Sequence, residues 1–333
     1  MTGDRMPPRT SDERRATSDE RRATSDGPSG RHARPSWWPP SPSGGRPYEA
    51  NASARSAPSP TRVPLCQRRN KPQIISGRST GYLGRVLTIG VDLAAEAIRT
   101  AVAWVEWSAG GANVREIEIQ ADDDLIVEAI KSADKAGIDC PLGWPDKFVD
   151  FIAAHRSGHV DVPAGTMGRT WRRDLALRVT DQIVYDLTGL TPLSVSADRI
   201  GHTAMRCAAL LADLARQGRP VDRGGEGVVV EVYPSASLKR WNLPHRGYKR
   251  SVNLGGLGHL IDELHAAAPW LDLGSYERMC RNSDDAADAV IAALTARASY
   301  QGLVTVPTPE QAGAAHTEGW IALPTSPICD LHP

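Results

Sequence analysis

Four acidic segments in the last three quarters of the chain contain residues suited to metal chemistry. Three of them place a carboxylate at or just past an apolar, strand-like run, and these carboxylates are Asp92, Asp139 and Glu231. The fourth, D-D-A-A-D-A-V-I-A-A, has a helical pattern and carries Asp284, Asp285 and Asp288. Carboxylate oxygens are hard ligands, and several at one sheet edge repel one another unless Mg²⁺ or Mn²⁺ neutralises them. The pattern predicts metal-assisted phosphoryl chemistry.

Within the helical segment, Asp288 is the first choice as a metal ligand. Asp284 and Asp285 fall in the first helical turn, where the macrodipole favours any carboxylate. Asp288 lies one turn deeper on the same face, where that explanation does not apply. The predicted metal ligands are therefore Asp92, Asp139, Asp288 and, second on the helix, Asp285.

Each candidate also has a structural alternative. Asp92 and Asp139 could shape turns after their strands. Glu231 stands between valines, and a buried charge is costly unless it is paired. It is predicted either to act in catalysis or to pair with an arginine such as Arg178.

The sequence predicts an oppositely charged tail and body. Residues 1–85 contain 16 Lys and Arg against 7 Asp and Glu, whereas residues 86–333 contain 23 against 32. The tail repeats T-S-D-E-R-R-A in tandem and then turns to Pro, Ser, Gly and Arg, a composition typical of disorder. It is interpreted either as a nucleic-acid-binding arm or as a mistranslated leader. No secretory segment or 18-residue apolar run occurs, which predicts a cytoplasmic protein with no membrane partner.

The body, residues 86–326, has the pattern of one α/β domain, followed by a short tail at 327–333. Apolar runs predict strands over 86–92, 100–107, 114–120, 138–140 and 228–232. Helical periodicity and stop signals predict helices over 123–135, 172–188, 203–217, 258–268 and 284–300. Three meander strands, a helix, two further strands and a late acidic helix is the order of a ribonuclease H-like mixed sheet flanked by helices.

Seven motifs in this order resemble the DUF429 family over roughly residues 86–324. They are G-V-D at 90–92, I-D-C-P-L-G at 138–143, R-V-T-D at 178–181, V-E-V-Y-P at 230–234, Y-K at 248–249, D-D-A-A-D-A at 284–289 and E-G-W-I at 318–321. Members of that family are described as predicted nucleases with a ribonuclease H-like fold. Residues 285–293 are also similar to the last acidic helix of Holliday-junction resolvases. The resemblance implies that Arg178 and Lys249 face substrate phosphate, the alternatives being an exposed helical pair and a solvated loop.

The leading hypothesis is a nuclease or phosphodiesterase that depends on Mg²⁺ or Mn²⁺ and acts on nucleic acid or another phosphoester. Asp92 would bridge two ions, and Asp139 and Asp288 would complete their shells. One alternative is an actin- or sugar-kinase-like ATPase, which the sequence Leu-Ala-Ala-Glu at 93–96 disfavours because it lacks a Gly-rich phosphate turn. A third hypothesis is a non-catalytic interaction module that retains the fold.

Overall fold

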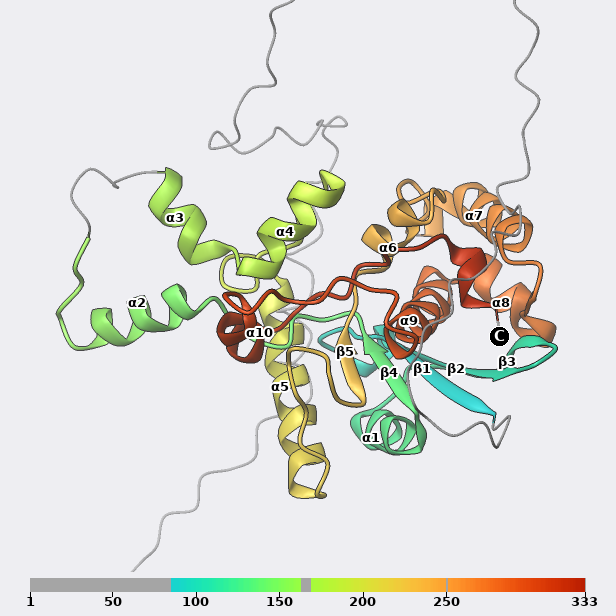
Figure 1. The fold of residues 1–333 in the computed structure, drawn as a ribbon, viewed down its shortest axis with the longest axis horizontal. Coiled ribbons are helices and arrows are strands. Elements are labelled where there is room, and N and C mark those ends of the chain that lie inside the picture. The colour runs from blue at the N-terminus through green and yellow to red at the C-terminus, as the bar shows by residue number, and fades with distance from the viewer. Residues whose placement is uncertain (1–84, 163–168, 250, 333) are drawn as a thin grey trace, which may run out of the picture. The chain divides into compact units, whose positions relative to one another are not determined.

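The structure is a computed structural model that describes residues 85–162, 169–249 and 251–332 (Figure 1). These residues form an α/β fold with a six-stranded mixed sheet in the order β5-β4-β1-β2-β3-β6. The strands are β1 (Val86–Asp92), β2 (Ala101–Ser108), β3 (Gly111–Ile119), β4 (Lys135–Ile138), β5 (Val229–Glu231) and β6 (Leu271–Asp272). The tail was predicted over residues 1–85, and residues 1–84 of it, including the tandem repeat, lie outside the described residues.

Strand direction brings three strand ends to one edge of the sheet. β1, β2 and β3 form the predicted antiparallel meander. β4 runs parallel to β1, and β5 runs parallel to β4. The carboxyl ends of β1, β4 and β5 therefore lie together, and this is where ligands commonly bind in α/β sheets.

β4 begins three residues before its predicted start because Lys135 belongs to the strand. The apolar pattern predicted a strand over 138–140, but the side chain of Lys135 is buried. Its ammonium group donates to the carbonyl oxygens of Gly225 and Gly227, each at 2.6 Å. These bonds satisfy the buried donor, so that a charged residue can occupy the strand. Asp139 consequently stands one residue past the strand end.

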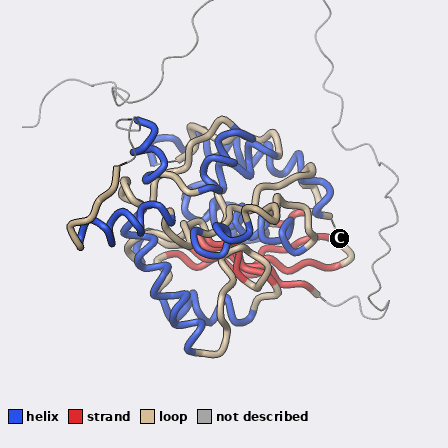
Figure 2. Tube along the Cα trace, turned by 60° about the vertical axis from the view of Figure 1, so that its left-hand side comes forward, coloured by secondary structure: helices blue, strands red, loops and turns tan. Residues whose placement is uncertain are grey.

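Helices cover both faces of the sheet (Figure 2). α9 (Asp284–Tyr300) packs with α7 (Leu254–Ala267) on one face, where they share a core with Ala101, Ala103 and Val105 of β2. α1 (Asp123–Ser132) and α5 (Ile200–Arg216) share a core with Ile89 and Val91 of β1 on the other face. The remaining α-helices are α2 (Asp146–Arg156), α3 (Arg169–Ala176), α4 (Val179–Thr188), α6 (Pro234–Arg240), α8 (Glu277–Asn282) and α10 (Ala312–Glu318).

α9 approaches the sheet closely because both surfaces carry small residues. A β-carbon added to Gly90 would overlap the carbonyl oxygen of Ala289. One added to Gly137 would lie 2.7 Å from the carbonyl oxygen of Ala292. Gly90 and Gly137 therefore let the alanine-rich helix lie against β1 and β4, and this contact sets the position of Asp288.

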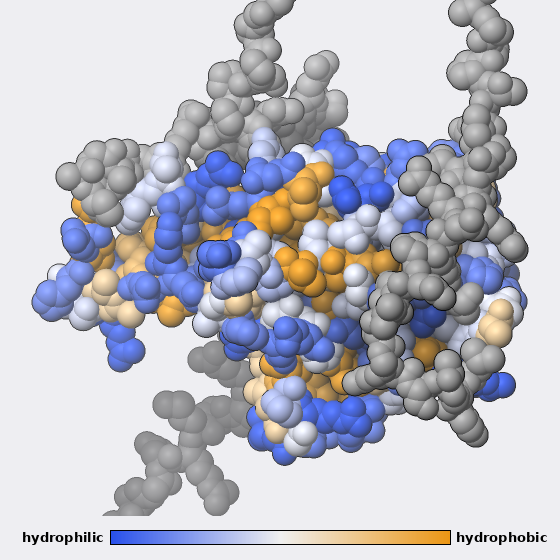
Figure 3. Space-filling view, in the orientation of Figure 1, coloured by the Kyte–Doolittle hydropathy of each residue, from blue (hydrophilic) through white to orange (hydrophobic). Residues whose placement is uncertain are grey.

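The predicted single helix over 172–188 is wrong at its centre. α3 ends at Ala176 and α4 begins at Val179, with Arg178 in an extended conformation between them. α2, which the sequence did not predict, has no buried residue and exposes Val149 and Ile152. Apolar and hydrophilic residues are correspondingly mixed in the left-hand part of Figure 3, the region of α2 and α3 in Figure 1.

Residues 328–331, assigned from sequence to the C-terminal tail, form a 3-10 helix. Ile328 and Leu331 are buried in the core beside α9. Among the described residues, no helix is long and apolar enough to cross a membrane.

Candidate functional site

Asp92 ends β1, Asp139 follows the end of the neighbouring parallel strand β4, and both point to the same face of the sheet. Val91 pairs with Ile138, and the amide of Asp139 donates to the carbonyl oxygen of Val91 at 2.8 Å. Gly90 and Gly137 both face α9. Since side chains on a strand alternate between faces, residues two positions later return to the α9 face. Both half-buried carboxylates therefore lie at the sheet edge beside the first turns of α9.

Asp288 completes the cluster from α9 and is bound by two adjacent residues. Its side chain is almost fully buried, with the residue 1% exposed. Tyr248 donates its hydroxyl to Oδ1 at 2.9 Å, and the Nζ of Lys249 lies 2.6 Å from Oδ2. The segment holding Tyr248 packs against α7 at Gly256, where a β-carbon would overlap the carbonyl oxygen of Gly247. A close backbone contact thus fixes the partners of Asp288.

The clustered charges shift the pKa values of the whole group. Burial and the charges of Asp288 and Asp139 raise the pKa of Asp92 well above its ordinary value. Burial raises the pKa of Asp139 to about 7, opposed by Lys249 and supported by Asp288. Burial lowers the pKa of Lys249, but Asp288 and Asp139 outweigh it, so the ammonium group stays charged. Strongly shifted carboxyls at a strand edge are typical of functional sites.

We expect the raised pKa of the Asp139 carboxyl to make the free energy of unfolding fall as pH rises. Its native carboxyl keeps a proton up to about pH 7, whereas the unfolded carboxyl has a pKa near 3.8. The native state therefore binds more protons between those values, and the free energy of unfolding falls with rising pH across that window. Asp139→Asn should remove this contribution, so that the variant gains stability relative to wild type from pH 5 to pH 8. Thermal melts in chelator test this, and parallel profiles for the two proteins would contradict it.

Asp285, predicted as the second helical ligand, is bound by an arginine that sequence reasoning missed. The Nε and Nη2 atoms of Arg99 donate to its two oxygens at 3.0 and 2.9 Å. The side chain of Arg99 is 63% exposed, so a cation stands at the rim of the cluster. Its position seven residues after Asp92 is the only sequence signal for it, because the loop between them shows no periodic pattern.

Glu231 and Arg178 lie on the other face of the sheet from the cluster, although the charge of Glu231 helps to raise the pKa of Asp139. Glu231 pairs with Ile138 across β4 and β5, which places it on the opposite face from Asp139. Arg178 is 1% exposed, and its guanidinium binds Glu231 at 2.6 Å and Asp181 at 2.9 Å. The structure therefore shows the alternative in which Glu231 pairs with Arg178. Arg178 does not face solvent, as a ligand of substrate phosphate would.

Two residues of the E-G-W-I motif support this buried ion pair. Glu318 accepts the amides of Asp146 and Val179 at 2.9 and 2.7 Å, so that it caps the starts of α2 and α4. Gly319 has a φ of +91°, and a β-carbon there would lie 2.8 Å from Oε2 of Glu231. The motif therefore joins the helical middle to β5.

The acidic cluster consists of Asp92, Asp139, Asp285 and Asp288, and in its present arrangement it offers two carboxylates to a cation. The described residues contain no group of three His, Cys, Asp or Glu side chains placed to hold a metal ion. Lys249 forms an ion pair with Asp288, and Arg99 forms one with Asp285. Asp92 and Asp139 remain, and two carboxylates completed by water and substrate oxygens suit Mg²⁺. The donor atoms thus fit the cation, with fewer protein ligands than the sequence predicted.

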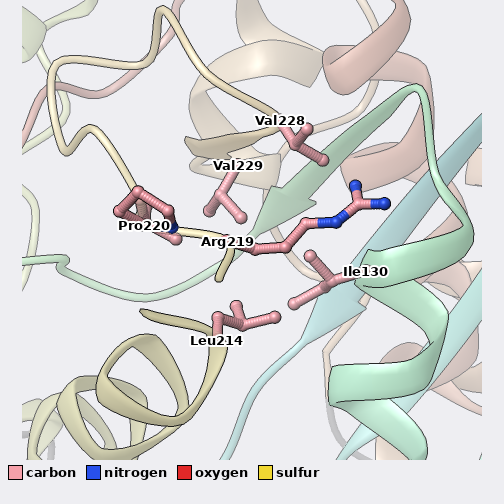
Figure 4. A pocket seen from close by; sticks show the side chains of 7 residues that line it. Ile130, Leu214, Arg219, Pro220, Val228 and Val229 are labelled. Atoms are coloured by element: carbon pink, nitrogen blue, oxygen red, sulfur yellow. The ribbon is translucent and has the colours of Figure 1, made fainter. Parts of the chain in front are cut away.

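A small apolar cavity lies elsewhere, beside the first residue of β5 (Figure 4). It has a volume of about 60 Å³ and is lined by Ile130, Leu214, Arg219, Pro220, Val221, Val228 and Val229. None of the candidate site residues lines this cavity.

Comparison with known proteins places the chain in a family. Residues 90–312 match the family described as "Protein of unknown function (DUF429)", and the chain belongs to it. No curated protein and no solved structure matches the chain.

Proposed function

We propose that the protein hydrolyses phosphodiesters with the help of Mg²⁺ or Mn²⁺ held by Asp92 and Asp139. The observation that carries this proposal is the placement of these two carboxylates on one face, at the ends of adjacent parallel strands, beside the charged Lys249. We also propose that the sheet is a ribonuclease H-like core. A three-strand meander followed by two parallel strands supports that assignment, and β6 is an addition at the outer edge.

The side chains divide the work between binding and positioning. Lys249 presents an ammonium group beside Asp92 and Asp139, where it would neutralise a phosphoryl oxygen. Asp288 and Tyr248 act as positioning residues, since their bonds fix that ammonium group. A bound cation would supply Lewis-acid activation of the phosphoryl group and of water. Tyr248 stays protonated as a donor, because burial and Asp288 raise its pKa.

Asp92→Asn tests the proposal. The substitution preserves volume and removes one charge, so the melting shift caused by Mn²⁺ should disappear. Hydrolysis of bis(p-nitrophenyl) phosphate should fall by at least about 100-fold, since even partners of metal ligands cost 10- to 100-fold. Stability in chelator should stay level or rise, because clustered carboxylates repel one another.

The matched control is Asp213→Asn at the end of α5, next to Leu214 and the small cavity. It should retain the Mn²⁺ shift and the activity. A Mn²⁺ shift that survives Asp92→Asn unchanged would remove Asp92 from the site. Reduced stability with metal affinity unaffected would identify Asp92 as a structural turn residue.

A non-catalytic interaction module is the second candidate. Lys249 and Arg99 already neutralise Asp288 and Asp285 without a metal, which is what a retained but inactive site would need. In that case neither Mg²⁺ nor Mn²⁺ changes the melting temperature of the wild-type protein, and no phosphodiester is cleaved.

A further inference from the structure

A stretch of thirty residues without an acidic residue follows Glu231. Residues 232–261 carry five Lys and Arg, namely Lys239, Arg240, Arg246, Lys249 and Arg250. The body as a whole has the opposite balance, with 32 Asp and Glu against 23 Lys and Arg over residues 86–333. The stretch is therefore a local basic segment in an acidic domain.

The basic segment starts and returns at the acidic cluster. It leaves β5 after Glu231, forms α6 and comes back through Gly247 to Tyr248 and Lys249, which bind Asp288. Arg246 is exposed three residues before Lys249. Arg240 is less available, because its Nε donates to the carbonyl oxygen of Pro324 at 2.9 Å.

Two side chains with rings, His245 and Tyr233, lie in the same segment as the remaining cations, Lys239 and Arg246. His245 is half-buried, and burial together with the charges of Lys239 and Arg246 lowers its pKa. Tyr233, directly before α6, is also half-buried. Burial raises the pKa of its phenol, and the charges of Asp139, Lys249 and Arg246 all act on it. Two residues after Tyr233, the hydroxyl of Ser235 lies 3.5 Å from that of Tyr248, which binds Asp288, so the start of α6 lies beside the acidic cluster.

We propose that Lys239 and Arg246 form a phosphate-binding rim for a single strand of nucleic acid that enters the site at Asp92 and Asp139. One small phosphoester needs only the ammonium group of Lys249. The two further cations of the basic segment, Lys239 and Arg246, would match the successive phosphates of a nucleic-acid strand. Tyr233, half-buried at the start of α6, offers an aromatic ring in the same segment, and a basic groove combined with aromatic rings is the usual means of holding single strands. The inference rests on the proposed function for the location of the cleaved phosphate.

Binding of a fluorescein-labelled oligothymidylate in chelator tests the rim without cleavage. The double variant Lys239→Gln/Arg246→Gln should bind about tenfold more weakly than wild type. The slope of log affinity against log salt should fall by about 1.4, or roughly 0.7 for each phosphate that the variant no longer neutralises. Hydrolysis of bis(p-nitrophenyl) phosphate should not change, because neither residue touches the reacting group.

The matched control is Lys131→Gln/Arg216→Gln, which removes two cations from ion pairs on α1 and α5. It should bind the oligonucleotide like wild type. Equal binding by the rim variant and wild type would overturn the inference, as would tighter binding of a duplex or of an oligoglutamate peptide. If Asp92→Asn leaves metal binding intact while the rim variant no longer binds the oligonucleotide, the rim stands and the proposed chemistry fails. If Asp92→Asn abolishes metal binding while the rim variant binds the oligonucleotide like wild type, the proposed chemistry stands and the rim is overturned.

Discussion

Replacing Arg178 with Met is expected to lower the free energy of unfolding by about 3–5 kcal/mol, the usual cost of breaking a buried ion pair. The guanidinium binds Glu231 and Asp181 and also donates to the carbonyl oxygen of Glu318 at 3.0 Å. Methionine fills much of the same volume but leaves two carboxylates buried without a cation. Denaturant unfolding at neutral pH measures the decrease.

Two further variants separate this explanation from others. Arg216→Met removes an exposed arginine from its ion pair with Asp213 and should change stability by less than about 0.5 kcal/mol. Combining Arg178→Met with Glu231→Gln should restore part of the stability, because one of the orphaned charges is removed as well. An Arg178→Met protein with wild-type stability but weaker substrate binding would instead support the phosphate-binding role predicted from the sequence.

The acids at the strand ends were predictable, whereas the partners of those acids were not. A carboxylate after an apolar run marks a strand end, and this signal located Asp92 at the end of β1, whereas Asp139 was predicted inside a strand over 138–140 and follows the end of β4. The side chain of Glu231 could not be placed on a face, because the valines around it have no alternation. The pairing of Lys249 with Asp288 joins residues that are far apart in the sequence, and the segment that makes it is packed closely against α7 at Gly247.

The same distinction applies to the fold. α9 has the predicted bounds, and Ser283 caps it by accepting the amide of Ala286. The break between α3 and α4 was missed because apolar periodicity continues through it. Its cause is tertiary, since Glu318, from the far end of the domain, caps α4 and the burial of Arg178 holds the linker extended.

Gly90→Ala is expected to destabilise the protein by about 3 kcal/mol or more, at the upper end for overpacking. The added methyl group would overlap backbone atoms of α9, which cannot rotate away as a side chain can. The helix would have to move off β1, and Asp288 would move with it. The variant should therefore show reduced Mn²⁺ affinity as well as reduced stability, and thermal melts with chelator and with Mn²⁺ report both.

Gly255→Ala provides the control, because α7 has open space at that position and alanine favours a helix over glycine by roughly 0.5–1 kcal/mol. It should be neutral or slightly stabilising and leave the Mn²⁺ shift unchanged. A Gly90→Ala protein that retains wild-type stability would show that α9 does not lie as close to β1 as the overlap requires. Asp288 would then lie farther from Asp92, and the positioning of Lys249 beside the two strand-end carboxylates would have no structural basis.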